Sequence, residues 1–337
     1  MNKYFKIFAE LFIFITLFVF INRLVAPKYI DSLVEGSLTS DYYKSRFNHD
    51  VLIFGDCEVY SNISPDVMFE TTGILAYNRA NSQQMMWQSY YLLQESLVYE
   101  TPKVVMLSVG GLRNGVNEAS EAYNRLAIDK MKWSSYKVDM INASKTKDET
   151  IFSYMFPILR YHSRIDSLTG EDIKYLFEDT AANYSGYIIN TKTVPYTNWP
   201  VKRELSDYSF DEKTVLYFDN FVQLCKEKGI TLILFKAPSL YPYWYDEWDN
   251  WVDSYAKDNG IVYLNYNNNE KALGLNYQTD TYDGGMHLNY NGAYKLSTFI
   301  ANQLTNLYGL ESHKGDPYYQ RKLFAFQDAV IKSQENN

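Results

Sequence analysis

The sequence predicts a three-layer α/β fold, in which helices cover both faces of a parallel sheet of five strands. Five short apolar runs, rich in β-branched and aromatic residues, are typical of strands that are buried on both faces. Segments with helical periodicity separate most of these runs, and this alternation favours parallel pairing. The chain has 337 residues, 46% of them hydrophobic, and is long enough to bury a large core.

We expect the strands at residues 51–54, 74–77, 104–109, 230–235 and 261–264. The main helices are expected at residues 82–99, 210–228, 243–257 and 292–307. The second of these carries Cys225 on its apolar face and stops at Gly229, a residue suited to a helix C-terminus. A last amphipathic helix is expected to begin at Asp316, as N-cap, and Pro317.

Residues 112–207 interrupt the alternation of strands and helices. They contain a helical piece at 151–161 and a more irregular part rich in Tyr, Asn and Thr. Ligands of parallel sheets bind outside the carboxyl ends of the strands. We therefore interpret this insertion as a lid or a substrate platform at that edge.

Composition excludes some classes of function. The net charge of −8 argues against nucleic acid, which requires a basic face to neutralise phosphates. The 32 tyrosines are either stacking platforms for sugars or a bias of the genome combined with ordinary packing. The two cysteines, Cys57 and Cys225, allow at most one bridge and exclude a disulfide framework.

The N-terminal segment, residues 7–25, is mostly apolar. At about 1.5 Å per residue, a helix there nearly spans a hydrocarbon core of roughly 30 Å. A cleaved signal peptide is the alternative, but Leu24-Val25-Ala26 is a poor cleavage site and Pro27 follows it. We expect an uncleaved anchor at residues 1–28 and a folded domain at 29–337, with the insertion at about 112–207. Basic residues flank both ends of the segment, so charge alone does not orient it.

The first candidate motif is Gly55-Asp56-Cys57, directly after the first expected strand. A glycine lets the chain turn sharply and presents the next side chains at the carboxyl end of the strand. Cys57 is then either an exposed nucleophile near backbone N–H groups or, as for most lone cysteines in sheets, a small buried side chain.

The second motif, Asp283-Gly284-Gly285-Met286-His287, precedes the last main helix. A carboxylate can hold one imidazole nitrogen and leave the other free to act as a base. The alternative is a surface loop with an incidental histidine. Because one motif follows the first strand and the other precedes the last helix, both are expected at the carboxyl edge of one sheet.

In this order the motifs resemble those of the SGNH/GDSL hydrolases, whose first block is Gly-Asp-Ser and whose last is Asp-x-x-His. The resemblance covers residues 48–110 and 210–310, but neither the N-terminal segment nor the insertion. It implies a flavodoxin-like, three-layer sheet. It also implies a catalytic site of Cys57 as nucleophile, His287 as base and Asp283 as the acid that orients the imidazole.

The nucleophile departs from the family pattern, because Cys57 stands where the family has serine. A thiolate is a capable acyl acceptor, and His287 could generate it. The neighbouring carboxylates of Asp56 and Glu58 are expected to raise the pKa of the thiol.

The acid also departs from the pattern, because it lies four residues before His287 and Gly284 occupies the family position. We expect Asp283 to reach the imidazole through a one-residue bulge. Asp280 is the alternative acid.

The blocks that form the oxyanion hole in the family are reduced. Asn78-Arg79-Ala80-Asn81 follows the second strand where the family has a glycine, and Gly110-Gly111-Leu112 follows the third where it has Gly-x-Asn. We expect the donors among the backbone N–H groups of Cys57 and Ala80, the Asn81 side chain and Asn114. Loss of one such donor costs about 100- to 1,000-fold in rate.

Membrane-anchored relatives with similarly reduced blocks are the D-alanyl transfer proteins of teichoic acid synthesis and the alginate-type O-acetylation proteins. They work outside the cytoplasmic membrane beside a multi-pass membrane O-acyltransferase. The resemblance thus implies an extracytoplasmic enzyme that transfers acyl groups to an envelope glycan or polymer, with such a partner. Two alternatives are a plain extracytoplasmic esterase and an inactive scaffold that binds a glycan or the O-acyltransferase.

The remaining histidines carry weaker signals. His49 is expected at the surface, His162 in the insertion is a candidate substrate contact, and His313 lies near the tail. No cluster of Cys, His and Asp has metal-ligand spacing, and no Gly-rich phosphate loop opens a helix after a strand. Neither a metal nor a cofactor is therefore expected.

Overall fold

The computed structural model describes residues 3–178, 184–198 and 201–336. Its centre is a sheet of five parallel strands in the order β2-β1-β3-β4-β5. This is the flavodoxin-like order, so the predicted fold class is confirmed. The strands are β1 (Val51–Gly55), β2 (Ala76–Ala80), β3 (Val104–Ser108), β4 (Thr231–Lys236) and β5 (Val262–Asn265).

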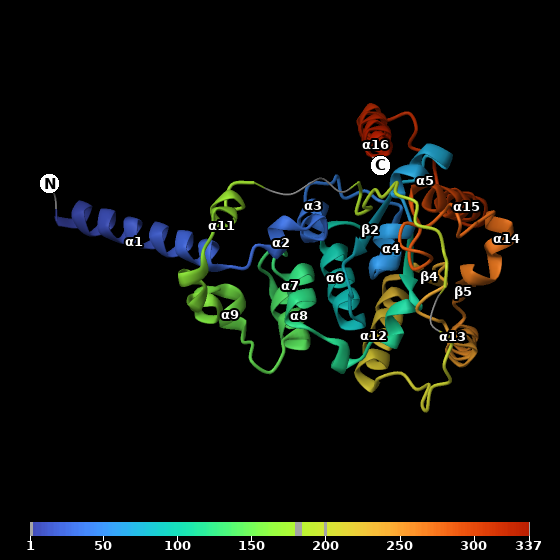
Figure 1. Ribbon diagram of the computed structural model, residues 1–337, viewed down its shortest axis with the longest axis horizontal. Helices are drawn as coiled ribbons and strands as arrows, with labels where there is room; N and C mark the ends of the chain where they lie inside the picture. Colours follow the sequence, from blue (N-terminus) through green and yellow to red (C-terminus); the bar gives the residue numbers. More distant parts are fainter. Residues whose placement is uncertain (1–2, 179–183, 199–200, 337) are drawn as a thin grey trace.

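Helices form a layer on each face of the sheet (Figure 1). Ile53 belongs to the core beneath one layer, and the next residue, Phe54, belongs to the core beneath the other. This alternation follows from the period of two in a strand, and each such buried side chain contributes about 1.5–3 kcal/mol of stability. The first layer contains α4 (Cys57–Asn62), α5 (Pro65–Thr72) and α15 (Tyr290–Tyr308). The second contains α6 (Met86–Tyr99), α12 (Glu212–Lys228) and α13 (Asp246–Asn259).

Strand β2 was predicted at residues 74–77 but lies at Ala76–Ala80. The prediction was wrong because the strand continues through two buried polar residues, Asn78 and Arg79. The Arg79 guanidinium donates to Glu95 Oε2 at 2.8 Å and lies 3.9 Å from the centroid of the Tyr42 ring. Both partners belong to helices. A search for apolar runs therefore cannot predict that Arg79 is buried in a strand.

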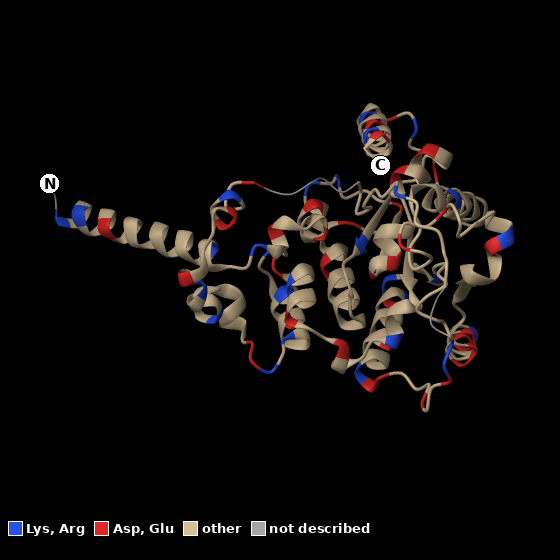
Figure 2. Cartoon of the chain, in the orientation of Figure 1, with Lys and Arg blue, Asp and Glu red and all other residues tan. Residues whose placement is uncertain are grey.

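Helix α1 (Lys3–Val25) extends away from the body of the molecule (Figure 1). Apart from Phe18, its large apolar side chains between Tyr4 and Ile21 are exposed. Charged residues lie only toward its two ends (Figure 2). The helix is long and apolar enough to cross a membrane.

The insertion begins with helices that extend the core. Leu126, Ala127 and Ile128 of α7 (Glu121–Ile128) are buried, as are Met140 and Ile141 of α8 (Ser135–Ser144). Four short elements follow next to α1 (Figure 1): α9 (Ile151–Met155), α10 (Ile158–Tyr161), η4 (His162–Ser167) and α11 (Gly170–Lys174). The single helix predicted at 151–161 is divided into α9 and α10 at Pro157, because proline lacks the N–H that a continuous helix needs.

Other short elements connect these layers: α2 (Tyr29–Ser32), η1 (Val34–Ser37), α3 (Leu38–Tyr42), η2 (Val109–Arg113), η3 (Val116–Glu118), η5 (Tyr266–Asn269) and α14 (Glu270–Leu273). The C-terminal helix α16 (Pro317–Glu335) begins as predicted, because Asp316 Oδ1 accepts a hydrogen bond from the Tyr318 N–H at 2.8 Å. Cys225 is fully buried in the core, also as predicted.

Candidate active site

Cys57 begins α4 directly after β1 and is half-buried. Asp56 is the N-cap of this helix, and its carboxylate accepts a hydrogen bond from the N–H of Glu58 at 3.0 Å. Gly55 allows a close approach here. A Cβ at this position would lie 2.6 Å from Cγ2 of Val59 and 2.7 Å from Cβ of Ser108. The glycine thus brings the start of α4 against the end of β3 and places Cys57 at the carboxyl edge of the sheet.

The loop that carries His287 is closed by Asp283. Asp283 Oδ2 lies 2.6 Å from His287 Nδ1, and Oδ1 accepts from the backbone N–H groups of His287 at 2.9 Å and Met286 at 3.1 Å. Gly284 and Gly285 have φ angles of 78° and 108°, in the left-handed region that glycine tolerates best. The two glycines therefore allow a carboxylate four residues away to reach the imidazole, and Nε2 of His287 remains for Cys57.

The thiol of Cys57 and the imidazole of His287 lie close enough for each to shift the pKa of the other. The Tyr282 ring stacks on this imidazole at 5.7 Å between centroids and an angle of 10°, and its hydroxyl lies 3.2 Å from the Ser61 hydroxyl on α4. The structure thus brings Cys57, His287 and Asp283 together from opposite ends of the domain.

Asp280, the alternative acid, lies elsewhere. Its carboxylate pairs with Lys295 Nζ at 2.6 Å and accepts from the Asn276 N–H at 2.9 Å. It is buried in these contacts and does not orient His287.

Four charged side chains lie beside Cys57, and we call them the ion cluster: Asp56, Glu58, Arg113 and Lys236. Glu58 lies 2.9 Å from Lys236 and 3.2 Å from Arg113, and Arg113 lies 3.6 Å from Asp56. Lys236 ends β4 and is completely buried. The two carboxylates that flank Cys57 are thus matched by two cations.

The sequence reasoning missed both cations. Arg113 falls at the start of the insertion, outside the motifs. Lys236 carried one usable signal, because it is a charged residue directly after the apolar run at 230–235. Such residues are rarely buried without a partner.

The ionisation of the site follows from these contacts. Burial and the Asp56 carboxylate raise the pKa of the Cys57 thiol, whereas its interaction with the neighbouring His287 lowers it. Burial acts to lower the pKa of His287, but Asp283 and Cys57 raise it well above its ordinary value. Burial also opposes ionisation of Glu58, but Lys236 and Arg113 hold the pKa of that carboxyl below its ordinary value. Both neighbouring carboxylates raise the pKa of Cys57, and Asp56 contributes more than Glu58.

The predicted oxyanion donors lie in different settings. Ala80 ends β2 and Asn81 follows it, with its amide donating to Gln84 at 2.9 Å and its carbonyl 3.3 Å from the Thr39 hydroxyl. Asn114 follows η2. Among the described residues, no hydrogen bond joins the side chain of Asn81 or Asn114 to Cys57. The N–H of Cys57 lies in the first turn of a helix, where intrahelical acceptors are lacking, and it is the best-placed donor of those predicted.

Residues 184–198 of the insertion support the His287 loop. The Val194 N–H donates to the Thr281 carbonyl at 3.0 Å, and the Val194 carbonyl accepts from Gly284 at 3.0 Å. From the other side, Asn62 Oδ1 accepts from the Leu288 N–H at 2.8 Å. Asn62 ends α4, so it joins the helix of Cys57 directly to the loop of His287.

The other histidines lie outside this group. His49 was expected at the surface, but it is buried and its Nδ1 lies 2.9 Å from Glu100 Oε2, a partner that offsets the cost of burial. His162 is exposed in η4, which contacts α1, and His313 pairs with Asp50 at 3.0 Å. In the described part of the chain, no three His, Cys, Asp or Glu side chains are grouped to hold a metal.

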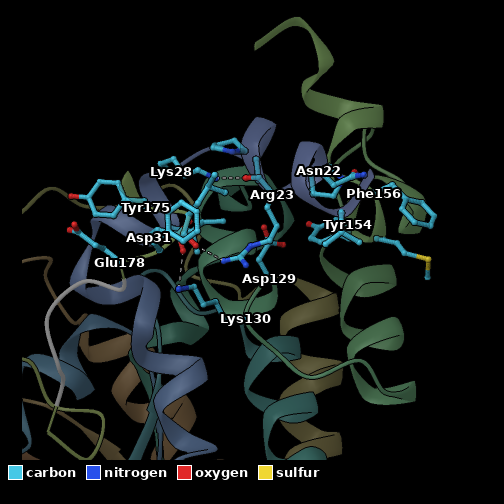
Figure 3. Close-up of a pocket in the computed structure, with 18 of the residues that line it drawn as sticks. Asn22, Arg23, Lys28, Asp31, Asp129, Lys130, Tyr154, Phe156, Tyr175 and Glu178 are labelled. Atoms are coloured by element: carbon cyan, nitrogen blue, oxygen red, sulfur yellow. Dashed lines mark hydrogen bonds and ion pairs between the residues drawn. The ribbon is translucent and has the colours of Figure 1, made fainter. Parts of the chain in front are cut away.

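Two cavities differ in their position relative to Cys57. One of about 260 Å³ is lined by Arg113 of the ion cluster and by the rings of Phe210 and Trp248. A larger cavity of about 560 Å³ lies at the end of α1 (Figure 3), away from Cys57.

No family model matches the chain, and no curated protein matches it in sequence. A protein from Bacteroides fragilis assigned as an acylhydrolase is 12% identical, with a TM-score of 0.37 over 78% of this chain and 88% of that chain. A protein from Desulfitobacterium hafniense assigned to the G-D-S-L lipolytic family is 14% identical, with a TM-score of 0.37 over 77% of this chain and 99% of that chain. A GDSL-like lipase from Bacteroides thetaiotaomicron is 13% identical, with a TM-score of 0.36 over 78% and 90%. Similarity at this level assigns no residue role to this chain.

Proposed function

We propose that this protein is a membrane-anchored acyl-transfer enzyme that modifies a glycan or polymer of the cell envelope. One observation carries the proposal: Cys57, at the start of a helix, lies beside His287, whose Nδ1 lies 2.6 Å from Asp283 Oδ2. A nucleophile, a base and a group that orients the base are the components of covalent acyl transfer.

The reaction has two halves. Cys57 Sγ attacks the carbonyl of an acyl ester or thioester while its proton passes to His287, and the leaving oxygen or sulfur takes that proton as the donor departs. The acceptor hydroxyl then gives its proton to His287 and attacks the acyl-cysteine. Sγ leaves as the new ester forms, and it recovers the proton from His287. In each half, the N–H of Cys57 at the start of α4 stabilises the negative charge on the carbonyl oxygen.

Contacts at the end of α1 support an anchor that is retained. The Arg164 guanidinium donates to the carbonyls of Val25 at 2.7 Å and Ala26 at 2.8 Å, and the Ile158 N–H donates to Asn22 at 3.1 Å. Cleavage after Ala26 would remove all three acceptors. We therefore propose that α1 crosses the cytoplasmic membrane and that the domain works outside it, beside a membrane O-acyltransferase as the resemblance implies.

The test is the acyl content of the envelope polymers in a strain that carries Cys57→Ala. We expect acylation to be lost, and unchanged acylation would contradict the catalytic role. Cys225→Ala is the matched control, because that cysteine is fully buried in the core on the other face of the sheet from Cys57. Cys57→Ser then shows whether a hydroxyl suffices at this position.

An inactive scaffold is the second candidate, and two observations favour it. The pKa of the Cys57 thiol is raised, and the Asn81 side chain is engaged by Gln84 and Thr39. A thiol-reactive acyl probe separates the two functions. Labelling of Cys57 that disappears in His287→Ala supports the enzyme, and labelling that is indifferent to His287 supports the scaffold. Turnover of a small acyl ester by the purified protein alone would instead identify a plain esterase.

A further inference from the structure

Residues 151–177, which we call the collar, expose several large apolar side chains next to α1. The collar contains α9, α10, η4 and α11, and three of these elements contact α1 (Figure 1). The exposed fraction is 63% for Phe152, 59% for Leu159, 56% for Ile173 and 81% for Phe177. Apolar side chains grouped in this way on one short segment usually mark a contact with a partner or a membrane.

The collar packs directly against the C-terminal part of α1 and is hydrogen-bonded to it. The Arg23 guanidinium donates to the Leu176 carbonyl at 3.0 Å, and the rings of Phe18 and Phe156 lie 5.5 Å apart. The bonds of Arg164 to Val25 and Ala26 add to this attachment. The collar therefore lies directly beside the C-terminal end of α1.

The length of α1 determines how close the collar lies to the bilayer. The part of the helix before its contact with the collar at Phe18, from Lys3 to Leu17, measures about 22 Å at about 1.5 Å per residue. A hydrocarbon core is roughly 30 Å thick, so a helix of this length has no surplus with which to hold the collar away from the bilayer.

We propose that the exposed side chains of the collar insert into the interface of the same bilayer that α1 crosses. The collar and α1 then form one rigid membrane-bound unit that sets the height and the orientation of the catalytic domain. Helix α4, which begins at Cys57, lies near the middle of the domain, farther from α1 than α7 and α8 (Figure 1). This inference rests on the proposed membrane anchor and is independent of the chemistry at Cys57.

The charged residues at the end of α1 do not suggest a charged ligand instead. In the cavity shown in Figure 3, Lys130 lies 2.9 Å from Asp31, and the Lys28 ammonium donates to the Arg23 carbonyl. These cations are already occupied by groups of the protein. The apolar side chains of the collar, in contrast, remain exposed.

The experiment places nitroxide spin labels on the full chain in vesicles of phosphatidylcholine and phosphatidylglycerol. Single cysteines are introduced by Ile173→Cys and Phe177→Cys, with Cys57→Ala and Cys225→Ala as the background. Collision rates with oxygen, which concentrates in lipid, and with a water-soluble nickel chelate are compared. Leu216→Cys on α12 is the matched aqueous control, because Leu216 and Ile173 are both 56% exposed. Phe12→Cys on α1 reports the membrane.

We expect the labels at Ile173 and Phe177 to shift toward the ratio of oxygen to nickel collisions seen at Phe12, and the label at Leu216 to remain aqueous. If Phe12 lies in lipid but both collar labels match Leu216, the collar proposal is overturned and the anchor stands. If Phe12 also reports water, both are overturned. Circular dichroism of each labelled protein confirms that these surface replacements leave the fold intact.

Discussion

His287 and Asp283 are joined by a 2.6 Å contact between Nδ1 and Oδ2, across a loop in which two consecutive glycines adopt left-handed φ angles. The same carboxylate accepts the backbone N–H of His287 at 2.9 Å. One side chain therefore holds both the ring and the backbone of the base. This arrangement makes the protonation state of His287 sensitive to Asp283.

Activity is expected to rise with pH through an apparent pKa above 6.5, the ordinary value for histidine. Because the pKa of His287 is raised, the imidazole stays protonated at lower pH. It must lose that proton before it can accept the proton of the Cys57 thiol and allow Sγ to attack. The measurement is kcat/KM for an acyl ester between pH 5 and 10. An acidic limb that lies below 6.5 would contradict the raised pKa of His287.

Asp283→Asn is expected to lower kcat by about 10⁴-fold, since the amide cannot stabilise the imidazolium. The acidic limb of the remaining activity should also move to lower pH, because the carboxylate that raises the pKa of His287 is lost. Asp280→Asn is the comparison, because Asp280 pairs with Lys295 instead. A similar loss of activity in both variants would show that the effect is structural.

Gly285→Ala is expected to destabilise the protein by about 1–3 kcal/mol and to impair catalysis. Its φ is 108°, and a Cβ there would lie 2.9 Å from Cδ1 of Leu240, so the loop of His287 must shift. Gly229→Ala is the control, because Gly229 has a φ of 65° with nothing within 4 Å of its Cβ position. We expect Gly229→Ala to lower only the free energy of unfolding in urea. Equal activity losses in both variants would refute the role of the loop geometry.

Lys236→Met is expected to cost about 3–5 kcal/mol of unfolding free energy, because it leaves Glu58 charged and partly unpaired in the interior. Adding Glu58→Gln should recover part of this loss, since the buried charge is then removed. Urea denaturation of the single and double variants measures both effects. Lys257→Met, which breaks an exposed pair with Asp253, should change stability by no more than about 1 kcal/mol. A double variant no more stable than Lys236→Met would count against this account of the ion cluster.

Asn62→Ala is expected to cost about 1–3 kcal/mol, because the buried N–H of Leu288 loses its acceptor. Catalysis should fall as well, since Asn62 joins the end of α4 to the loop of His287. Thermal unfolding and kcat/KM are the two measurements. Asn302→Ala serves as a control, because that side chain is exposed and bonds only within its own helix. Full activity in Asn62→Ala would mean that the loop holds its position without this bond.

The success of the strand predictions depended on burial. Strands β1, β3 and β4 lie in the interior of the sheet, so both faces are apolar and the runs are visible in the sequence. Strand β2 is also buried, but Arg79 and Asn78 obtain polar partners from distant elements, and the apolar run therefore ended too early.

The sequence by itself determined the α/β class, the apolar N-terminal helix, and the expectation that Cys57 and His287 meet at one sheet edge. Each follows from a local pattern, because periodicity and strand polarity are set by neighbours along the chain. Only the tertiary structure decided that Glu58 is matched by Lys236 and Arg113, and that the collar is fixed to the end of α1. Those contacts join residues far apart in sequence, and their energies depend on burial and distance, which no spacing of residues records.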